Sequence, residues 1–226
     1  MVFSVAPHMT RRLVELGAEP DRIETFPRGV DTDRFVPSPR PRDPRRPVIL
    51  SNRRMESVYN IEQLIRAVPM VLREHPGALF MLYGEGSLKP GLESLARAEG
   101  VADSVRFLGA IDHDRVPGTL ASADVYVSCS RSDGASVSLF EAMASGLYPV
   151  VSDIEANRSW IDGRNGELVP LDDPGAMAEA LVRAIDGLAT CDPVLIQNRG
   201  LIEKKASWSQ NMPRMEAAYL RLTGLV

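Results

Sequence analysis

In Asp124-Val-Tyr-Val-Ser-Cys129 the chain has the β-branched, apolar run of a buried strand. It continues into Ser130-Arg-Ser-Asp-Gly-Ala-Ser-Val-Ser-Leu-Phe-Glu-Ala-Met-Ala-Ser-Gly146, a small polar loop followed by a helical pattern over 137–145. A second apolar strand, Pro149-Val-Val-Ser152, comes soon after. Strand, helix and strand in this order are typical of a parallel sheet. Ligands bind beyond the carboxyl ends of such strands, so we expect a site in the loop 130–136.

The same alternation extends on both sides of this stretch. Further strands are predicted at 48–51, 78–83, 105–108 and 166–169, and further helices at 61–72, 88–99 and 113–122. Pro69 interrupts the first of these helices and is expected to kink it. The pattern predicts an α/β fold: a Rossmann-like parallel sheet with helices on both faces.

Two flanks differ from this core. Residues 1–36 hold about one strand, one helix and one strand, too little for a domain, and 191–226 have a helical pattern. Residues 37–47 contain five prolines and four arginines, which favours a stiff hinge; a patch for an anionic lipid or a partner is the alternative. The predicted division is therefore an N-terminal remnant (1–36), a hinge (37–47), a core domain (48–190) and C-terminal helices (191–226).

Composition excludes several classes of protein. The net charge of −4 argues against a nucleic-acid binder. Cys129 and Cys191 are too few for a disulfide framework, and no apolar run reaches the roughly 20 residues of a membrane span. None of the three lysines lies in a Gly-Lys-Ser/Thr context, which excludes a P-loop ATPase. We expect a cytoplasmic protein, with peripheral membrane contact as the alternative.

The loop 130–136 and the helix behind it carry the clearest chemistry. A helix start offers unpaired N–H groups to an anion, and Ser136 or Ser138 can cap it. Asp133 precedes the helix and Glu141 lies about one turn inside it, so the two carboxylates could bind the hydroxyls of a sugar or ribose. The alternative is structural: Asp133 as a helix cap and Glu141 as a surface residue.

Asp133, seven residues, and Glu141-Ala-Met-Ala-Ser-Gly146 resemble the nucleotide-sugar signature of family 4 retaining glycosyltransferases, which have the two-domain GT-B fold. Supporting pieces follow the order of that family over nearly the whole chain. They are Phe26-Pro-Arg-Gly-Val-Asp31, Asn52-Arg53, Tyr83-Gly-Glu-Gly86, Val105-Arg-Phe-Leu-Gly109, Pro149-Val-Val-Ser-Asp153, Asp162-Gly-Arg-Asn-Gly-Glu-Leu168 and Trp208.

The resemblance implies a role for each matched position. Glu141 would hold the ribose, Asp133 the donor sugar and Arg53 the phosphates; these three are the candidate catalytic residues. The other candidate binding residues contribute backbone groups around the sugar, the diphosphate and the base. They are Gly84, Gly86, Gly109, Ala110, Ile111, Gly134, Ala135, Ser136, Val137, Ser138 and Leu139.

The implied activity is transfer of a hexose-type sugar from a nucleoside-diphosphate donor to a glycan, lipid or small-molecule acceptor. Arginine and helix N–H groups would hold the diphosphate, so no metal or cofactor is expected. Two features depart from the family pattern: Asp133 stands where most relatives have Glu, and Val58 or a neighbour replaces a phosphate-binding lysine, with Arg54 as the nearest substitute.

The resemblance also implies a further N-terminal domain, in the same or another chain, which would bind the acceptor. The alternative function is a catalytically silent nucleotide-sugar-binding or regulatory module that pairs with a separate N-terminal-domain partner.

Three other signals are assigned to structure. Asp31-Thr-Asp33 and Asp112-His-Asp114 match a short metal-binding pattern, but their positions favour helix or turn caps. Gly84-Glu-Gly86 has Lys89 where a dinucleotide fingerprint needs its third glycine. Cys129 ends a buried strand and is expected to be a core residue.

Overall fold

The larger of two sheets holds six parallel strands. The computed structural model describes residues 1–39 and 42–223, and the order in the sheet is β5-β4-β3-β6-β7-β8. The strands are β3 (Val48–Ser51), β4 (Leu79–Tyr83), β5 (Val105–Gly109), β6 (Val125–Ser128), β7 (Tyr148–Ser152) and β8 (Glu167–Val169). Each was predicted to within a residue or two at its ends, and the predicted α/β class is confirmed.

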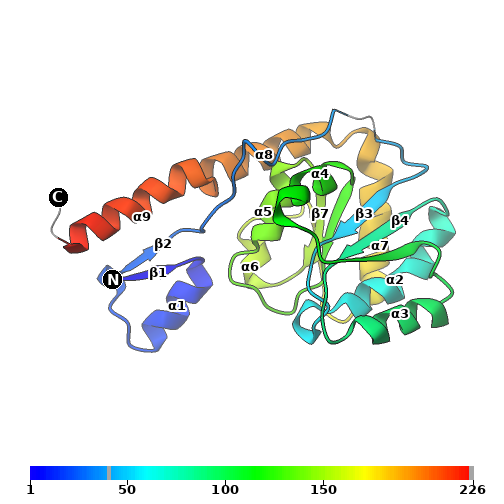
Figure 1. Cartoon of the computed structure of the whole chain (residues 1–226), viewed down its shortest axis with the longest axis horizontal. Coiled ribbons are helices and arrows are strands. Elements are labelled where there is room, and N and C mark those ends of the chain that lie inside the picture. Colours follow the sequence, from blue (N-terminus) through cyan, green and yellow to red (C-terminus); the bar gives the residue numbers. More distant parts are fainter. Residues whose placement is uncertain (40–41, 224–226) are drawn as a thin grey trace.

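Helices cover both faces of this sheet (Figure 1). In β6, Val125 and Val127 belong to the core under α2, α3 and α7, while Tyr126 points into the core under α4, α5 and α8. All three side chains are buried, which explains why the strand is apolar throughout instead of alternating. The helices are α2 (Ile61–Glu74), α3 (Lys89–Ala98), α4 (Val116–Ala121), α5 (Val137–Ala144), α6 (Glu155–Arg158), α7 (Pro174–Asp186) and α8 (Asp192–Lys205).

The strand order reverses between β3 and β6. From β3 the chain moves outward to β4 and β5, and it returns to the centre at β6 before moving outward again to β7 and β8. The connections on the two sides run in opposite directions, so the loops after β3 and β6 diverge and leave a crevice at the carboxyl edge. The predicted loop 130–136 lies at this crevice.

The structure adds two details on the helices. Helix α2, predicted over 61–72, runs through Pro69 to Glu74, and its apolar face, including Leu64 and Val68, is buried. Helix α7 was not predicted, although Asp173 caps it by accepting a hydrogen bond from the Ala176 N–H and Pro174 occupies its first turn. That Asp-Pro pair is a helix-start signal in the sequence itself.

A smaller unit stands beside the six-stranded sheet (Figure 1). It consists of β1 (Val2–Ser4), α1 (Pro7–Glu15) and β2 (Ile23–Thr25), with β1 and β2 paired in parallel, and α9 (Trp208–Thr223) extends over it from the core. Short 3₁₀ turns lie at Pro20–Arg22, Ser57–Tyr59, His113–Arg115 and Gly187–Ala189.

The chain passes between the two units twice, and backbone hydrogen bonds join the two passages. Val30 donates its N–H to the Ala206 carbonyl at 2.8 Å and accepts from the Trp208 N–H at 2.9 Å. After this crossing, Arg42 donates to the Gly146 carbonyl at 3.1 Å, so this part of the Pro/Arg-rich segment lies against the core. Residues 40–41 of the predicted hinge are outside the described residues.

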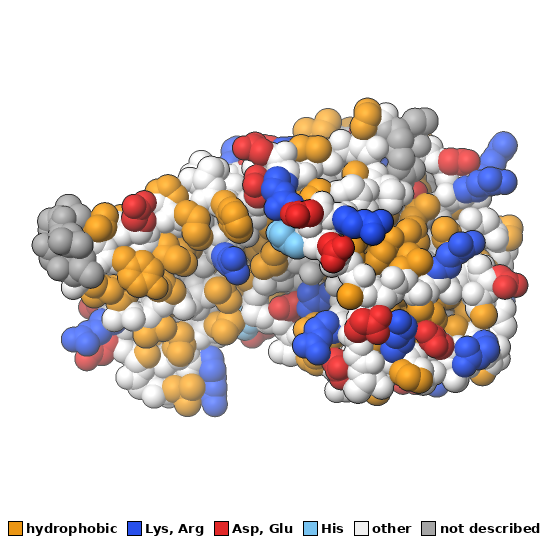
Figure 2. Space-filling view, in the orientation of Figure 1, with side chains coloured by type: hydrophobic (Ala, Val, Ile, Leu, Met, Phe, Trp, Pro, Cys, Tyr) orange, Lys and Arg blue, Asp and Glu red, His pale blue; other side chains and the backbone are white. Residues whose placement is uncertain are grey.

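The surface is uneven in character. Figure 2 shows hydrophobic side chains gathered over α9 and the small unit, while charged side chains dominate the six-stranded unit. The exposed apolar residues of the small unit and α9 include Val2, Val14, Leu16, Tyr219 and Leu222. Within residues 1–39 and 42–223, no helix is long and apolar enough to cross a bilayer.

Candidate functional site

Arg53 links the loops that follow the two central strands. Its guanidinium lies over the ring of Tyr59, 4.5 Å from the ring centre. Its Nη2 donates to Asp133 Oδ2 at 2.6 Å, and its Nη1 lies 3.3 Å from the hydroxyl oxygens of both Ser136 and Ser138. The predicted phosphate-binding arginine and the predicted donor loop therefore meet at the crevice between β3 and β6.

Arg53 stays charged although only 9 % of it is exposed. Burial works to lower the pKa of its guanidinium, but Tyr126 and Asp133 beside it outweigh burial, and the net pKa lies above the ordinary value. Its Nε is buried and has no hydrogen-bond partner among the described residues. Arg53 thus keeps donor capacity beyond its contacts within the protein.

Asp133 has both carboxylate oxygens engaged. Oδ2 accepts from Arg53, and Oδ1 accepts from the backbone N–H of Gly134 at 2.9 Å. The side chain is 19 % exposed. A sugar hydroxyl reaching Asp133 would have to use a remaining lone pair or replace one of these two contacts.

Helix α5 begins at the donor loop, as the sequence predicted. Ser136 is its N-cap, with an extended backbone and an Oγ that accepts from the Leu139 N–H at 3.4 Å. The first N–H groups of a helix have no partner inside the helix and carry partial positive charge. Ala135 and Val137 flank the cap, so the start of α5 provides backbone donors next to Arg53.

The side chain of Glu141 lies on the other side of α5 from Arg53. It lines a cavity of about 170 Å³ together with Arg34, His113 and Trp208. Burial raises the pKa of Glu141 to about 7, and Arg34 opposes this only in part. No hydrogen bond to this carboxylate is found within residues 1–39 and 42–223, so its oxygens are available to an incoming pair of hydroxyls.

The glycines after β4 serve close backbone packing. A Cβ on Gly84 would lie 2.4 Å from the Arg53 carbonyl oxygen, and one on Gly86 would lie 2.3 Å from that of Met55. These two positions hold the Arg53 loop in place instead of facing an open cavity. Their assignment as binding residues stays a prediction.

The predicted base-binding edge begins where β5 ends. Gly109 accepts a hydrogen bond from the Gly84 N–H at 2.7 Å, and Ala110 and Ile111 continue along the same edge, exposed and half-buried respectively. This edge is therefore connected to the loop that packs on Arg53.

Two neighbours of the donor loop were not singled out from the sequence. His8 and Arg131 line a cavity of about 300 Å³ with Asp133 and Glu155. His8 Nε2 lies 3.2 Å from the Asp133 carbonyl oxygen, although 125 positions separate the two residues. Arg131 stood in the quoted loop, but no local signal could indicate that His8 lies beside it.

One aspartate in each Asp-x-Asp pattern, Asp31 and Asp114, has a structural partner. Asp31 Oδ1 accepts from the backbone N–H groups of Asp33 and Arg34 at 3.1 and 3.3 Å, as expected of a turn cap. Asp112 is the N-cap of a 3₁₀ turn, but its side chain makes no capping hydrogen bond, and Asp114 pairs with Arg34 at 3.0 Å. In the part of the chain that the structure describes, no three His, Cys, Asp or Glu side chains are grouped to hold a metal ion.

Comparison with known proteins identifies the family. The family model described as "Glycosyl transferases group 1" matches residues 46–187. The chain is 28% identical over 215 residues to a subunit of the phosphatidylinositol N-acetylglucosaminyltransferase of Arabidopsis thaliana, covering 91% of this chain and 45% of that protein. It is 34% identical over 176 residues to the phosphatidyl-myo-inositol mannosyltransferase of Mycobacterium tuberculosis, covering 74% of this chain and 44% of that protein.

A solved structure agrees at the level of the fold. TarM from S. aureus, crystallised with UDP, superposes with a TM-score of 0.83 at 20% sequence identity, over 95% of this chain and 43% of that one. The chain belongs to the group 1 glycosyltransferase family and has the Rossmann-like fold of a GT-B domain. It spans a little under half the length of these relatives.

Proposed function

We propose that this chain is the donor-binding half of a retaining glycosyltransferase and that it takes a nucleoside-diphosphate hexose. One observation carries most of the proposal: Arg53 and Glu141 lie on two sides of the start of α5, at the crevice where the strand order reverses. A cation, a helix start and a buried carboxylate match the phosphate and ribose parts of such a donor. Retention of configuration is taken from the family resemblance.

The proposed roles follow the chemistry of the donor. During transfer, the bond between the sugar's anomeric carbon and the diphosphate breaks, and the bonding electrons stay on the phosphate oxygen. The oxygen of an acceptor hydroxyl bonds to the carbon, and its proton passes to the departing diphosphate. Arg53 and the first N–H groups of α5 would stabilise the charge that develops on the diphosphate. Glu141 would accept from the two ribose hydroxyls, Asp133 would contact the sugar, and Gly109, Ala110 and Ile111 would border the base.

The proposal extends to the acceptor and to a partner domain. Both curated relatives above are named for reactions on phosphatidylinositol lipids, which supports a lipid acceptor and peripheral membrane contact. The small unit has an apolar surface that includes Leu16 and Tyr219, and within residues 1–39 and 42–223 the outer edges of β1 and β2 pair with no further strand. Both features support an N-terminal domain, in the same or another chain, that would complete this sheet.

Calorimetric titration with UDP-, GDP- and ADP-sugars tests the donor site. We expect one nucleotide series to bind, and Glu141→Gln to weaken that binding at least about tenfold. Glu179→Gln, at an exposed carboxylate on α7 whose partner Arg183 lies 3.9 Å away, is the matched control and should change nothing. Absence of binding for all three series, or equal losses in both variants, would contradict the proposal.

A further inference from the structure

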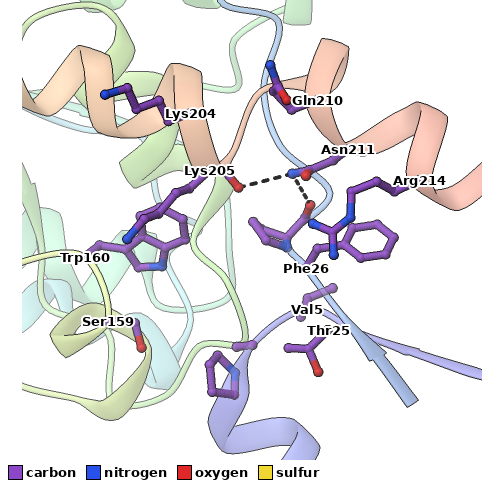
Figure 3. Close-up of a pocket in the computed structure, with 13 residues that line it drawn as sticks. Val5, Thr25, Phe26, Ser159, Trp160, Lys204, Lys205, Gln210, Asn211 and Arg214 are labelled. Atoms are coloured by element: carbon purple, nitrogen blue, oxygen red, sulfur yellow. Dashed lines mark hydrogen bonds between the residues drawn. The ribbon is translucent and has the colours of Figure 1, made fainter. Parts of the chain in front are cut away.

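A second cavity lies between the small unit and the core, away from Arg53 and Glu141. It has a volume of about 370 Å³ and is enclosed by the ends of β1 and β2, the residues after α6, and the α8–α9 junction. Figure 3 shows Trp160 and Lys205 on one side of it and Phe26 and Arg214 on the other. Its walls therefore combine aromatic surface with positive charge.

The charge in this cavity is uncompensated. Three cations, Lys204, Lys205 and Arg214, are among its thirteen lining residues, and none of these thirteen is Asp or Glu. Within residues 1–39 and 42–223, none of the three cations forms an ion pair, although most arginines of the six-stranded unit do. Two of the chain's three lysines meet here. Cations gathered around one hollow repel one another unless an anion enters it.

The cavity is held in shape by a buried amide. Asn211 is 2 % exposed, and its Nδ2 donates to the Pro27 carbonyl at 2.8 Å and lies 3.3 Å from the Lys205 carbonyl oxygen. This residue fixes the α8–α9 junction against the small unit (Figure 3). The backbones that carry Lys205 and Arg214 are therefore positioned before any ligand arrives, which lowers the cost of binding.

A purely structural explanation covers only part of this arrangement. Lysines in the last turn of α8 complement the partial negative charge of that helix end. That does not account for Arg214, which comes from α9 and lies over Phe26, 4.5 Å from the ring centre. It also does not account for the open aromatic wall made by Trp160.

We propose that this cavity binds a phosphate monoester that carries an apolar group. The phosphate would lie between Lys205 and Arg214, with Lys204 at the rim, and the apolar group would lie against Trp160. Amine and guanidinium groups are the usual phosphate ligands, and aromatic faces accept a flat or aliphatic substituent. The source is either a free phosphate ester or the head group of a phosphomonoester lipid.

The site is connected to the donor helix by one aromatic contact. Trp160 packs on Phe140 of α5 with ring centres 4.4 Å apart, and Phe140 directly precedes Glu141. Because Lys205 and Arg214 take no part in the proposed donor site, loss of the second site should leave nucleotide binding intact. The two proposals can therefore fail separately.

The test is calorimetry on the full chain with phenyl phosphate, with phenol as the uncharged analogue. We expect phenyl phosphate to bind saturably and phenol not to bind. Lys205→Ala and Arg214→Ala should each weaken binding at least about tenfold, and Lys205→Arg should largely retain it. Arg73→Ala, at an exposed arginine of α2, is the matched control.

A second experiment distinguishes a lipid head group from a free phosphate ester as the ligand. The protein is sedimented with phosphatidylcholine vesicles that contain or lack phosphatidic acid. A lipid head group is identified if only the vesicles with phosphatidic acid bind the wild-type protein and if Lys205→Ala abolishes that binding. Saturable phenyl phosphate binding without such retention identifies a free ester. The site is refuted if no phenyl phosphate binds, or if its binding is the same in wild type, Lys205→Ala and Arg214→Ala while nucleoside diphosphate binding is normal.

Discussion

Glu141 lies in surroundings that disfavour its charge. Its pKa is raised from 4.5 to about 7 because the carboxyl group is desolvated. Between these two pH values the folded state keeps a proton that the unfolded state has released, so the free energy of unfolding should fall as pH rises through this window, by about 3 kcal/mol in total. Glu141→Gln should remove this fall and be more stable than wild type at pH 8. Urea unfolding at pH 5 and pH 8 measures the free energy of unfolding of both proteins. The same fall between these two pH values in wild type and in Glu141→Gln would contradict the prediction.

The same carboxyl group should make nucleotide binding depend on pH. Ribose hydroxyls donate hydrogen bonds, so they bind the ionised form of Glu141, whose fraction grows as pH rises through about 7. We expect the affinity for a nucleoside diphosphate to increase between pH 6 and pH 8 in wild type. Titration of Glu141→Gln over the same range reports the dependence that comes from the ligand's own phosphate. Identical pH profiles for the two proteins would remove Glu141 from the ribose site.

Arg53 should matter for stability as well as for binding. Arg53→Ala would leave Asp133 partly buried without its partner, at a cost of about 3 kcal/mol, and would remove the guanidinium from the ring of Tyr59. Arg53→Lys keeps the charge but loses the forked geometry, so it should recover part of the stability and little of the nucleotide affinity. Thermal unfolding and calorimetry on both variants test this. A fully stable Arg53→Ala protein would mean that Asp133 does not depend on the pair.

At this scale the sequence could not indicate how the predicted site residues contact one another. Asp133, Glu141 and Arg53 were singled out as candidates, but the direct pairing of Asp133 with Arg53 joins positions 80 apart and has no local signal. His8 was missed for the same reason. Gly84 and Gly86 were assigned to ligand binding. In the structure, a side chain at either position would collide with the backbone of Arg53 or Met55, which explains why both are glycine.

At the scale of elements, the strands were easy to predict because each is a short apolar run between turn signals. Helix α7 was missed, and it shows what a cap contributes. Asp173 Oδ1 accepts from the Ala176 N–H at 2.9 Å. Asp173→Ala should lower the free energy of unfolding by about 1 kcal/mol, while Asp173→Asn keeps the acceptor and should change it little. Chemical denaturation compares the two, and equal losses would show that charge, not capping, is the contribution.

At the scale of the whole molecule, the described residues form one side of the proposed active site. Residues 1–39 and 42–223 provide the proposed donor site, while the two-stranded sheet of β1 and β2 leaves a backbone edge unpaired on each strand and carries exposed apolar side chains such as Val2. A transfer reaction needs the acceptor held against the donor and water excluded. On the proposed assignment, donor binding would depend on the core alone, whereas transfer would depend on what covers the small unit.

We therefore expect this chain to bind donor and to transfer nothing until an N-terminal half is added. Donor turnover with a panel of acceptors, measured before and after adding the matching N-terminal half of a group 1 glycosyltransferase, tests the expectation. Hydrogen exchange provides an independent readout: the amides of β1 should become protected on addition, because the new strands would pair with its free edge, while the amides of β8 in the core should not change. Protection without transfer would favour a silent nucleotide-sugar-binding module. Efficient transfer by the isolated chain would overturn the half-enzyme proposal, since it requires an acceptor site formed by these residues alone.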